Sequence, residues 1–295
     1  MRRVRDWWAN PWGQPRFLAA VTWGYMAWSI VPVGIAVLFS FNDGRSRSVW
    51  QGFSMRWYWG DPNLSVLHDP SMRGALEQSL KLAALDMVIA VPLGVGLALG
   101  LTRWVGYGAR PVNFLMLFPL VTPEIVMAVS LLLIFVTLYK IPLGTDAQVL
   151  GQVTFSISYV VVVVRSRLLS IGKQYEEAAR DLGASALGAL RLVLMPLLTP
   201  AIFASLMVVF ALSIDDFVVT DYLSSNESTQ TVPIKIYSSV RGTTTPALNA
   251  LATVMVLATL AAVGLAFFVY RRVNSLQRAE AGTGTALHEI AALEM

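Results

Sequence analysis

Long apolar runs separated by short polar segments dominate the hydropathy pattern of the chain. A helix needs about 20 mostly apolar residues to cross a hydrocarbon core about 30 Å thick. Six runs reach or approach that length, and the fourth is the shortest. They are Phe17–Phe41, Leu80–Leu101, Val112–Leu138, Gln148–Val164, Leu198–Leu223 and Leu248–Tyr270. The pattern predicts an all-α, polytopic membrane protein with six transmembrane helices.

These runs predict three regions along the chain. Residues 1–16 form an N-terminal segment, residues 17–270 a six-helix transmembrane domain, and residues 271–295 a C-terminal tail. The basic stretch "MRRVRDWW" before the first run resembles the start of a signal peptide. The run is long, however, and no small-residue cleavage site follows it, so we expect a retained helix.

Composition supports the membrane interpretation. Of the 295 residues, 56% are hydrophobic and 14% are charged, whereas soluble domains have about 45–50% and about 25%. There is no cysteine, which rules out disulfides and thiolate metal sites. The two histidines, His68 and His288, are far apart in sequence, so we expect no metal site.

Lys and Arg are distributed unevenly between alternate loops. The segments on one side of the predicted spans, which include both termini, carry 14 of these residues, and the other segments carry 8. Cytoplasmic loops of membrane proteins are enriched in Lys and Arg. We therefore expect both termini in the cytoplasm.

Carboxylates lie inside the predicted spans. They are Glu124 in "FPLVTPEIVMAVS", Asp215 and Asp216 in "ALSIDDFVVTDYL", and Asp86 in "LAALDMVIAVP". Ionisable side chains at this depth usually face a bundle interior or a cavity, and Pro119 and Pro123 predict a kink beside Glu124. A pathway lined with carboxylates suits a cationic solute, so Glu124, Asp215 and Asp216 are candidate pathway residues. The alternative is pairing with a base or a backbone amide on a neighbouring helix, which we favour for Asp86.

One polar island interrupts the apolar runs, "SIGKQYEEAARDLGASALGALRLVLMPLLTP" from Ser170 to Pro200. Early acidic residues favour a helix start, and apolar residues recur every three or four positions. These are Leu182, Ala186, Leu190 and Val193. Gly183 predicts a turn, and Pro196 predicts a second interruption before the fifth span. The island fits an amphipathic helix that docks into a partner's groove; the alternative is a helix resting on lipid headgroups.

No G-x-x-x-x-G-K-[ST] loop is present, so the chain does not bind ATP in that way. Transport would then be coupled to an ion or driven by a separate subunit. The stretch "EAARDLGASALGALRLVLMP" resembles the EAA loop of importer-type ABC transporter permeases, with Val193 and Met195 in place of the family's Ile and Leu. The residues that match in spacing are Glu177, Ala178, Ala179, Gly183 and Pro196.

The resemblance implies a type I ABC importer permease fold, with a cytoplasmic coupling loop at about residues 165–197 that docks on an ATPase subunit. It assigns ATPase coupling to Glu176, Glu177, Ala178, Ala179, Asp181, Gly183 and Pro196. It implies no catalytic residue and no cofactor on this chain, since ATP and Mg would be held by the partner ATPase.

Further stretches, including "SIDDFVVTDYLSS" and "TVPIKIYSSVRG", are similar to the spermidine/putrescine permease subfamily, in particular its second permease subunit. The similarity implies polyamine import by alternating access across the bacterial cytoplasmic membrane. It also implies three partners: a homologous permease, an ABC ATPase dimer and an extracytoplasmic substrate-binding protein. Relatives of this subfamily import opines, aminoethylphosphonate or ferric iron, which are the alternative solutes.

Two other classes of protein fit the sequence less well. An ion-coupled secondary transporter would also carry intramembrane carboxylates, but it would not need the Glu177–Pro196 loop. An intramembrane enzyme would need a nucleophile and a base, and the spans contain neither Cys nor His.

Two glycines and an aromatic cluster also suggest how the helices pack and where the membrane surface lies. Gly96 and Gly100 are predicted to allow close helix packing. The cluster Trp57, Tyr58 and Trp59 is typical of a membrane-interface belt. The alternative is that these rings offer cation–π faces to a polyamine.

Overall fold

The computed structural model describes residues 16–46, 48–103, 106, 108–240 and 245–293, with side chains as far as residue 272 apart from 16, 109, 240 and 269. The five long helices are α2 (Arg16–Phe39), α3 (Pro70–Arg103), α7 (Thr145–Ile171), α10 (Met195–Asp215) and α13 (Pro246–Leu293). The short helices are α4 (Ala109–Leu115), α5 (Phe118–Val121), α6 (Glu124–Leu133), α8 (Gln174–Asp181), α9 (Ala186–Ala189), α11 (Val218–Tyr222) and α12 (Val232–Val240).

Four short segments have other helical geometries. Three are π-helical, η1 (Arg56–Gly60), η2 (Ile134–Tyr139) and η3 (Leu190–Leu194), and η4 (Glu227–Thr229) is a 3-10 helix. Segment η2 continues α6 directly, and η3 joins α9 to α10. Within the described residues the only β pairing is a single bridge between Asn42 and Phe53. The all-α prediction is therefore confirmed.

The predicted membrane spans are found, with one strongly bent. Five helical stretches are long and apolar enough to cross a membrane, and a sixth span forms if the bent pair Arg110–Val121 and Glu124–Tyr139 is counted as one. The chain direction bends by 106° between the two halves of that pair. The break falls between Thr122 and Pro123, both in extended conformation, because Pro123 cannot donate a helical hydrogen bond. The predicted kink beside Glu124 is confirmed.

The fifth predicted span is wrong at its C-terminal end. It was expected to run to Leu223, but α10 ends at Asp215, and Asp216 is extended with ψ 117°. A new short helix, α11, starts at Val218. The apolar residues after the aspartate pair therefore belong to a second segment, and the pair lies at a helix break.

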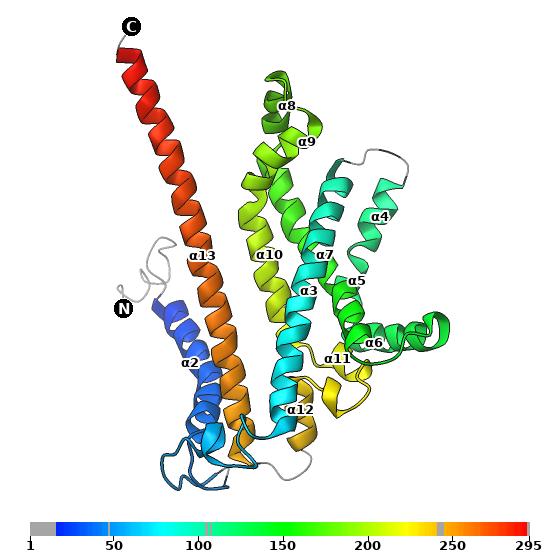
Figure 1. The fold of residues 1–295 in the computed structure, drawn as a ribbon, viewed down its shortest axis with the longest axis vertical. Coiled ribbons are helices and arrows are strands. Elements are labelled where there is room, and N and C mark those ends of the chain that lie inside the picture. Colours follow the sequence, from blue (N-terminus) through cyan, green and yellow to red (C-terminus); the bar gives the residue numbers. More distant parts are fainter. Residues whose placement is uncertain (1–15, 47, 104–105, 107, 241–244, 294–295) are drawn as a thin grey trace, which may run out of the picture.

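Helices α3, α7 and α10 pack together as the centre of the bundle (Figure 1). Their buried aliphatic side chains form the main core. Helix α3 approaches α7 closely at Gly94, where an added Cβ would lie 2.5 Å from the Val160 Cβ. Gly96 and Gly100 make no such contact within the described chain, since an added Cβ would meet no heavy atom within 4 Å at either position.

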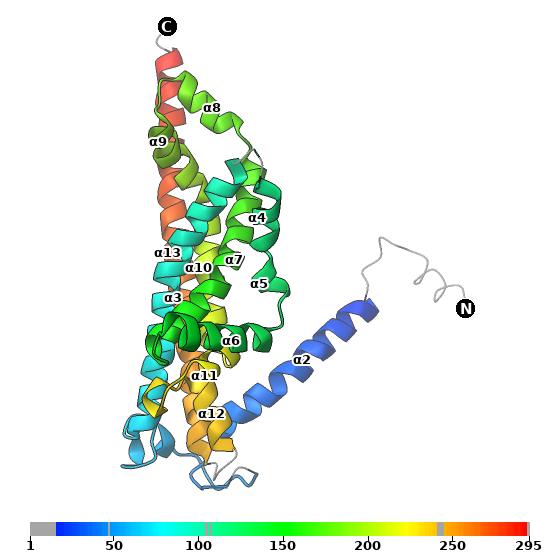
Figure 2. The same ribbon diagram turned by 90° about the vertical axis from the view of Figure 1, so that its right-hand side faces the viewer.

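The two ends of the bundle differ. Helices α8 and α9 lie at the same end as the C-terminal end of α13, while α12 and the α2–α3 connection lie at the opposite end (Figure 1). Helix α2 leans away from the bundle (Figure 2). Its side chains from Phe17 to Ile35 are exposed, which is expected for an apolar helix surrounded by lipid.

The α2–α3 connection is organised around Trp57. This side chain is fully buried, and its indole nitrogen donates a 2.5 Å hydrogen bond to the Asn42 carbonyl. The prediction that Trp57 belongs to an interface belt is therefore wrong, whereas Trp59 is exposed. Nearby, the Arg56 guanidinium bonds to Asp61 at 2.8 Å and lowers the pKa of that carboxyl group.

Candidate functional site

A cavity of about 430 Å³ brings together the four carboxylates that the sequence analysis singled out. Asp86 comes from the middle of α3, Glu124 is the first residue of α6, and Asp215 and Asp216 lie at the end of α10. No Lys or Arg of the described chain lines this cavity. The described lining of the cavity therefore contains four carboxylates and no basic side chain.

Helix breaks position three of the carboxylates. Glu124 follows the break at Pro123 and stands in the first turn of α6, where the helix dipole favours a negative charge. Asp216 is extended, and its Oδ1 accepts a 3.1 Å hydrogen bond from the Val219 amide at the start of α11. Both breaks thus place acidic side chains at the same cavity.

Polar residues of α7 hold the two less accessible carboxylates. Gln152 Nε2 donates to Asp216 Oδ2 at 3.0 Å, and the Ser156 hydroxyl donates to Asp86 Oδ2 at 2.6 Å. Gln152 and Ser156 are four residues apart and so share a helix face. The sequence analysis did not single out these two residues, although polar residues at this spacing in a valine-rich span were a signal for them.

The four carboxylates differ in accessibility. Asp86 is fully buried, Asp216 is partly buried, and Glu124 and Asp215 are exposed. The pairing that we favoured for Asp86 exists, but its partner is a serine hydroxyl rather than a base or a backbone amide. For Asp216 the sequence allowed either a place in the pathway or a partner on a neighbouring helix. The structure shows a hydrogen bond to α7 and a place in the cavity lining.

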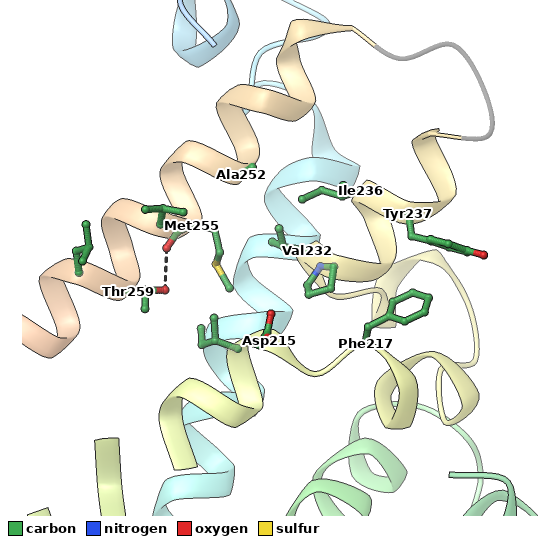
Figure 3. Close-up of a pocket in the computed structure, with 12 residues that line it drawn as sticks. Asp215, Phe217, Val232, Ile236, Tyr237, Ala252, Met255 and Thr259 are labelled. Carbon is green, nitrogen blue, oxygen red and sulfur yellow. Dashed lines mark hydrogen bonds between the residues drawn. The ribbon is translucent and has the colours of Figure 1, made fainter. Parts of the chain in front are cut away.

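Asp215 also borders a second cavity of about 620 Å³, which α12 and α13 complete (Figure 3). Most of its lining is apolar, including Val232, Ile236 and Met255. Figure 3 shows the Asp215 carboxylate between this apolar wall and Phe217. Asp215 and Phe217 line both cavities.

The EAA-like loop lies at the other end of the bundle. Helix α8 presents Glu177, Ala178 and Asp181 at the surface and buries Ala179. Glu176 instead pairs with Arg103 at the end of α3 and with Arg180.

The loop turns where the sequence predicted. Gly183 has φ +87°, a conformation that side chains with a Cβ rarely adopt. Ser185 then caps α9 by accepting a 3.1 Å hydrogen bond from the Gly188 amide.

Helix α7 continues to Ile171, and the start of the cytoplasmic loop at about residue 165 stays a prediction. Two other details of the loop prediction are wrong. Leu182 is 90% exposed at a break between helices, so the four apolar positions do not form one stripe. The second interruption at Pro196 is absent, because residues 186–215 form one continuous helical span. Pro196 lacks a backbone N–H and cannot donate a helical hydrogen bond. The π-helical segment η3, which ends at Leu194, changes the hydrogen-bond register just before this position.

The absence of a metal site at the two histidines stays a prediction. His68 Nδ1 lies 2.9 Å from the Ser65 hydroxyl, and the side chain of His288 is outside the described residues. No group of three or more potential metal ligands occurs among the residues that the structure describes.

The bundle, its bent third span and its acid-lined cavity define a multi-pass membrane protein of the transport class. Comparison with known proteins gives the family. The family model described as "Binding-protein-dependent transport system inner membrane component" matches residues 90–278. The chain belongs to this family and is a permease subunit of an ABC importer.

Individual relatives agree with this assignment. The putrescine transport system permease protein PotI of Escherichia coli K12 is 35% identical over 92% of this chain and 97% of its own length. The spermidine/putrescine transport system permease protein PotC of Haemophilus influenzae is 35% identical over 84% of this chain and 94% of its own. A bacterial alginate ABC transporter, solved with an alginate-bound periplasmic protein, matches with a TM-score of 0.70 at 17% identity over 87% of this chain and 94% of its own. The fold is thus that of an ABC importer permease.

Proposed function

We propose that this chain moves polyamines such as spermidine and putrescine into the cytoplasm. The observation that carries the proposal is the cavity with four carboxylates and no base. Each ammonium group of a polyamine can exchange its water for a carboxylate, since charge-assisted hydrogen bonds are the stronger ones. The methylene segments between the ammonium groups would lie against Phe155, Tyr159 and Phe217, which also line the cavity.

The relatives support a cationic solute. Two of them, at 35% identity, are named as putrescine or spermidine/putrescine permeases. The alginate transporter has the same fold but carries an acidic polysaccharide. The fold therefore accommodates solutes of either charge, and the side chains of the cavity must select the solute.

We assign the driving force to a separate ABC ATPase dimer that binds ATP and Mg. The exposed residues of α8, Glu177, Ala178 and Asp181, together with the turn at Gly183 and the exposed Pro196, would form its docking surface. Ala179 is buried and would pack α8 against the rest of the chain. Glu176 would link α8 to α3 through Arg103. ATP binding would then shift the permease between inward and outward states.

The proposal includes two further partners and an orientation. A second homologous permease would complete the translocation path, and an extracytoplasmic binding protein would deliver the solute. The membrane is the bacterial cytoplasmic membrane, with both termini in the cytoplasm. The excess of Lys and Arg in the segments on the side of the termini supports this orientation. Helix α8 also lies at the same end as the C-terminal end of α13, which agrees with it.

Competition uptake tests the proposal. Proteoliposomes would contain this chain with its homologous permease, ATPase and binding protein, and take up labelled putrescine in the presence of ATP. We expect unlabelled spermidine and putrescine to compete, and an opine, aminoethylphosphonate or ferric iron not to compete. Uptake of one of these alternative solutes instead of putrescine would refute the polyamine assignment. Uptake that follows an ion gradient without ATP would favour a secondary transporter.

A further inference from the structure

Asp86 is the one carboxylate of the cavity that is fully buried. Its Oδ2 receives the hydrogen bond from Ser156, and its Oδ1 receives none from the described residues. A buried carboxylate oxygen without a donor is rare, because burial removes the water that would otherwise solvate the charge. The position of Asp86 in the cavity wall therefore calls for a positively charged or hydrogen-donating occupant.

Helix α7 lines the same cavity with groups that suit a cation. Ser156 donates its only proton to Asp86, so the lone pairs of its hydroxyl oxygen remain available as acceptors. Phe155 and Tyr159 lie on the same stretch of α7 and line the same cavity, with ring centroids 5.1 Å apart. Aromatic rings attract ammonium groups through their electron-rich faces.

The cavity holds no base that could neutralise Asp86 from inside. Its other charged lining residues are Glu124, Asp215 and Asp216, and all of them are acidic. No described lining residue can therefore compensate an ionised Asp86, and a cation in the cavity would do so. An ammonium group, with three donors and no acceptor, matches one free carboxylate oxygen and one hydroxyl lone pair.

We propose that Asp86 and Ser156, flanked by Phe155 and Tyr159, form a subsite that binds one ammonium group of the transported amine. The inference rests on the proposed import of polyamines, and it assigns the buried wall of the cavity to direct contact with the solute. Asp86 is then a substrate-binding residue, and its negative charge, rather than its shape, is what transport requires.

Two substitutions separate charge from shape. Asp86→Asn keeps the side-chain volume and an oxygen that can accept from Ser156, but it removes the charge. Asp86→Glu keeps the charge and adds one methylene group to a fully buried position. A packing role predicts that Asn is tolerated and Glu is harmful, whereas an ammonium subsite predicts the opposite order. Asp221→Asn is the matched control, because Asp221 is exposed and lines none of the cavities described above.

The experiment measures ATP-driven putrescine and spermidine uptake in proteoliposomes with the complete transporter, normalised to assembled complex. We expect Asp86→Asn to lower uptake about tenfold or more, as for loss of one charged hydrogen bond. Asp86→Glu should retain more activity than Asp86→Asn, and Asp221→Asn should match the unmodified transporter. Uptake by Asp86→Asn equal to that of the unmodified protein, or greater loss in Asp86→Glu, would overturn the subsite. Failure of the unmodified transporter to take up either amine would instead contradict the proposed function.

Discussion

Gln152 Nε2 and Asp216 Oδ2 lie 3.0 Å apart, so that α7 is hydrogen-bonded to the break that follows α10. The same amide group accepts a 2.8 Å hydrogen bond from Ser213, one turn earlier in α10. Gln152 is itself buried. One side chain therefore fixes both the end of α10 and the direction of an acidic side chain of the cavity.

Substitution of Gln152 by Leu should impair transport. It leaves the Ser213 hydroxyl and one Asp216 oxygen without their present partner, at a cost of about 1–3 kcal/mol for a buried polar group. We expect uptake per assembled complex to fall about tenfold. Thr154→Val is the control, since the exposed Thr154 bonds only within its own helix, to the Leu150 carbonyl. Equal uptake by the two variants would show that the Asp216 position does not depend on Gln152.

The contact between Arg103 and Glu176 joins the end of α3 to α8. Because α3 also carries Asp86, this ion pair is a direct link between the EAA-like loop and the helix that reaches the cavity. Arg103→Ala should leave stability within about 1 kcal/mol, because Arg103 is exposed and Glu176 keeps its pairing with Arg180. It should lower the amount of solute moved per ATP hydrolysed.

The control for this variant is Arg73→Ala. Arg73 and Glu77 form an exposed pair near the other end of α3, so the variant removes a similar contact without touching α8. Measured uptake divided by measured ATP hydrolysis should fall for Arg103→Ala and stay constant for Arg73→Ala. A constant ratio in both would contradict the mechanical link.

Glu177→Lys and Gly183→Leu should abolish ATP-dependent uptake while the permease remains inserted. Glu177→Lys reverses a charge on the exposed surface of α8. Gly183→Leu forces a residue with a Cβ into φ +87°, which costs about 1–2 kcal/mol and alters the turn. Co-purification of the ATPase with the permease is the direct measurement, and we expect its loss.

Gly264→Ala is the matched glycine control, because an added Cβ there meets no described atom within 4 Å. It should retain both the ATPase and the uptake. Full co-purification of the ATPase with both loop variants would place the docking surface elsewhere.

The sequence predicted the features that depend on local patterns. Apolar length located the spans, Pro123 located the bend, and Gly183 located the turn of the loop. It misplaced the end of α10, because the residues after Asp216 are as apolar as a continuing helix.

Features that depend on tertiary contacts were not accessible to such patterns. Ser156 and Asp86 are 70 positions apart, so their hydrogen bond follows only from the packing of α7 on α3. For the same reason Glu176 was grouped with the docking residues, although much of its side chain is occupied by Arg103 and Arg180. Trp57 was assigned to the interface because its aromatic neighbours suggested a belt, yet it is buried among residues of other elements.

The most direct test of the account is putrescine uptake by the complete transporter carrying Asp215→Asn and Asp216→Asn together. The control carries Asp146→Asn and Asp221→Asn, two exposed acids outside the cavities described above. At equal amounts of assembled complex, the account predicts uptake lower by about tenfold or more in the first variant and unchanged uptake in the control. Equal uptake in both variants would contradict the claim that the acidic cavity carries the solute.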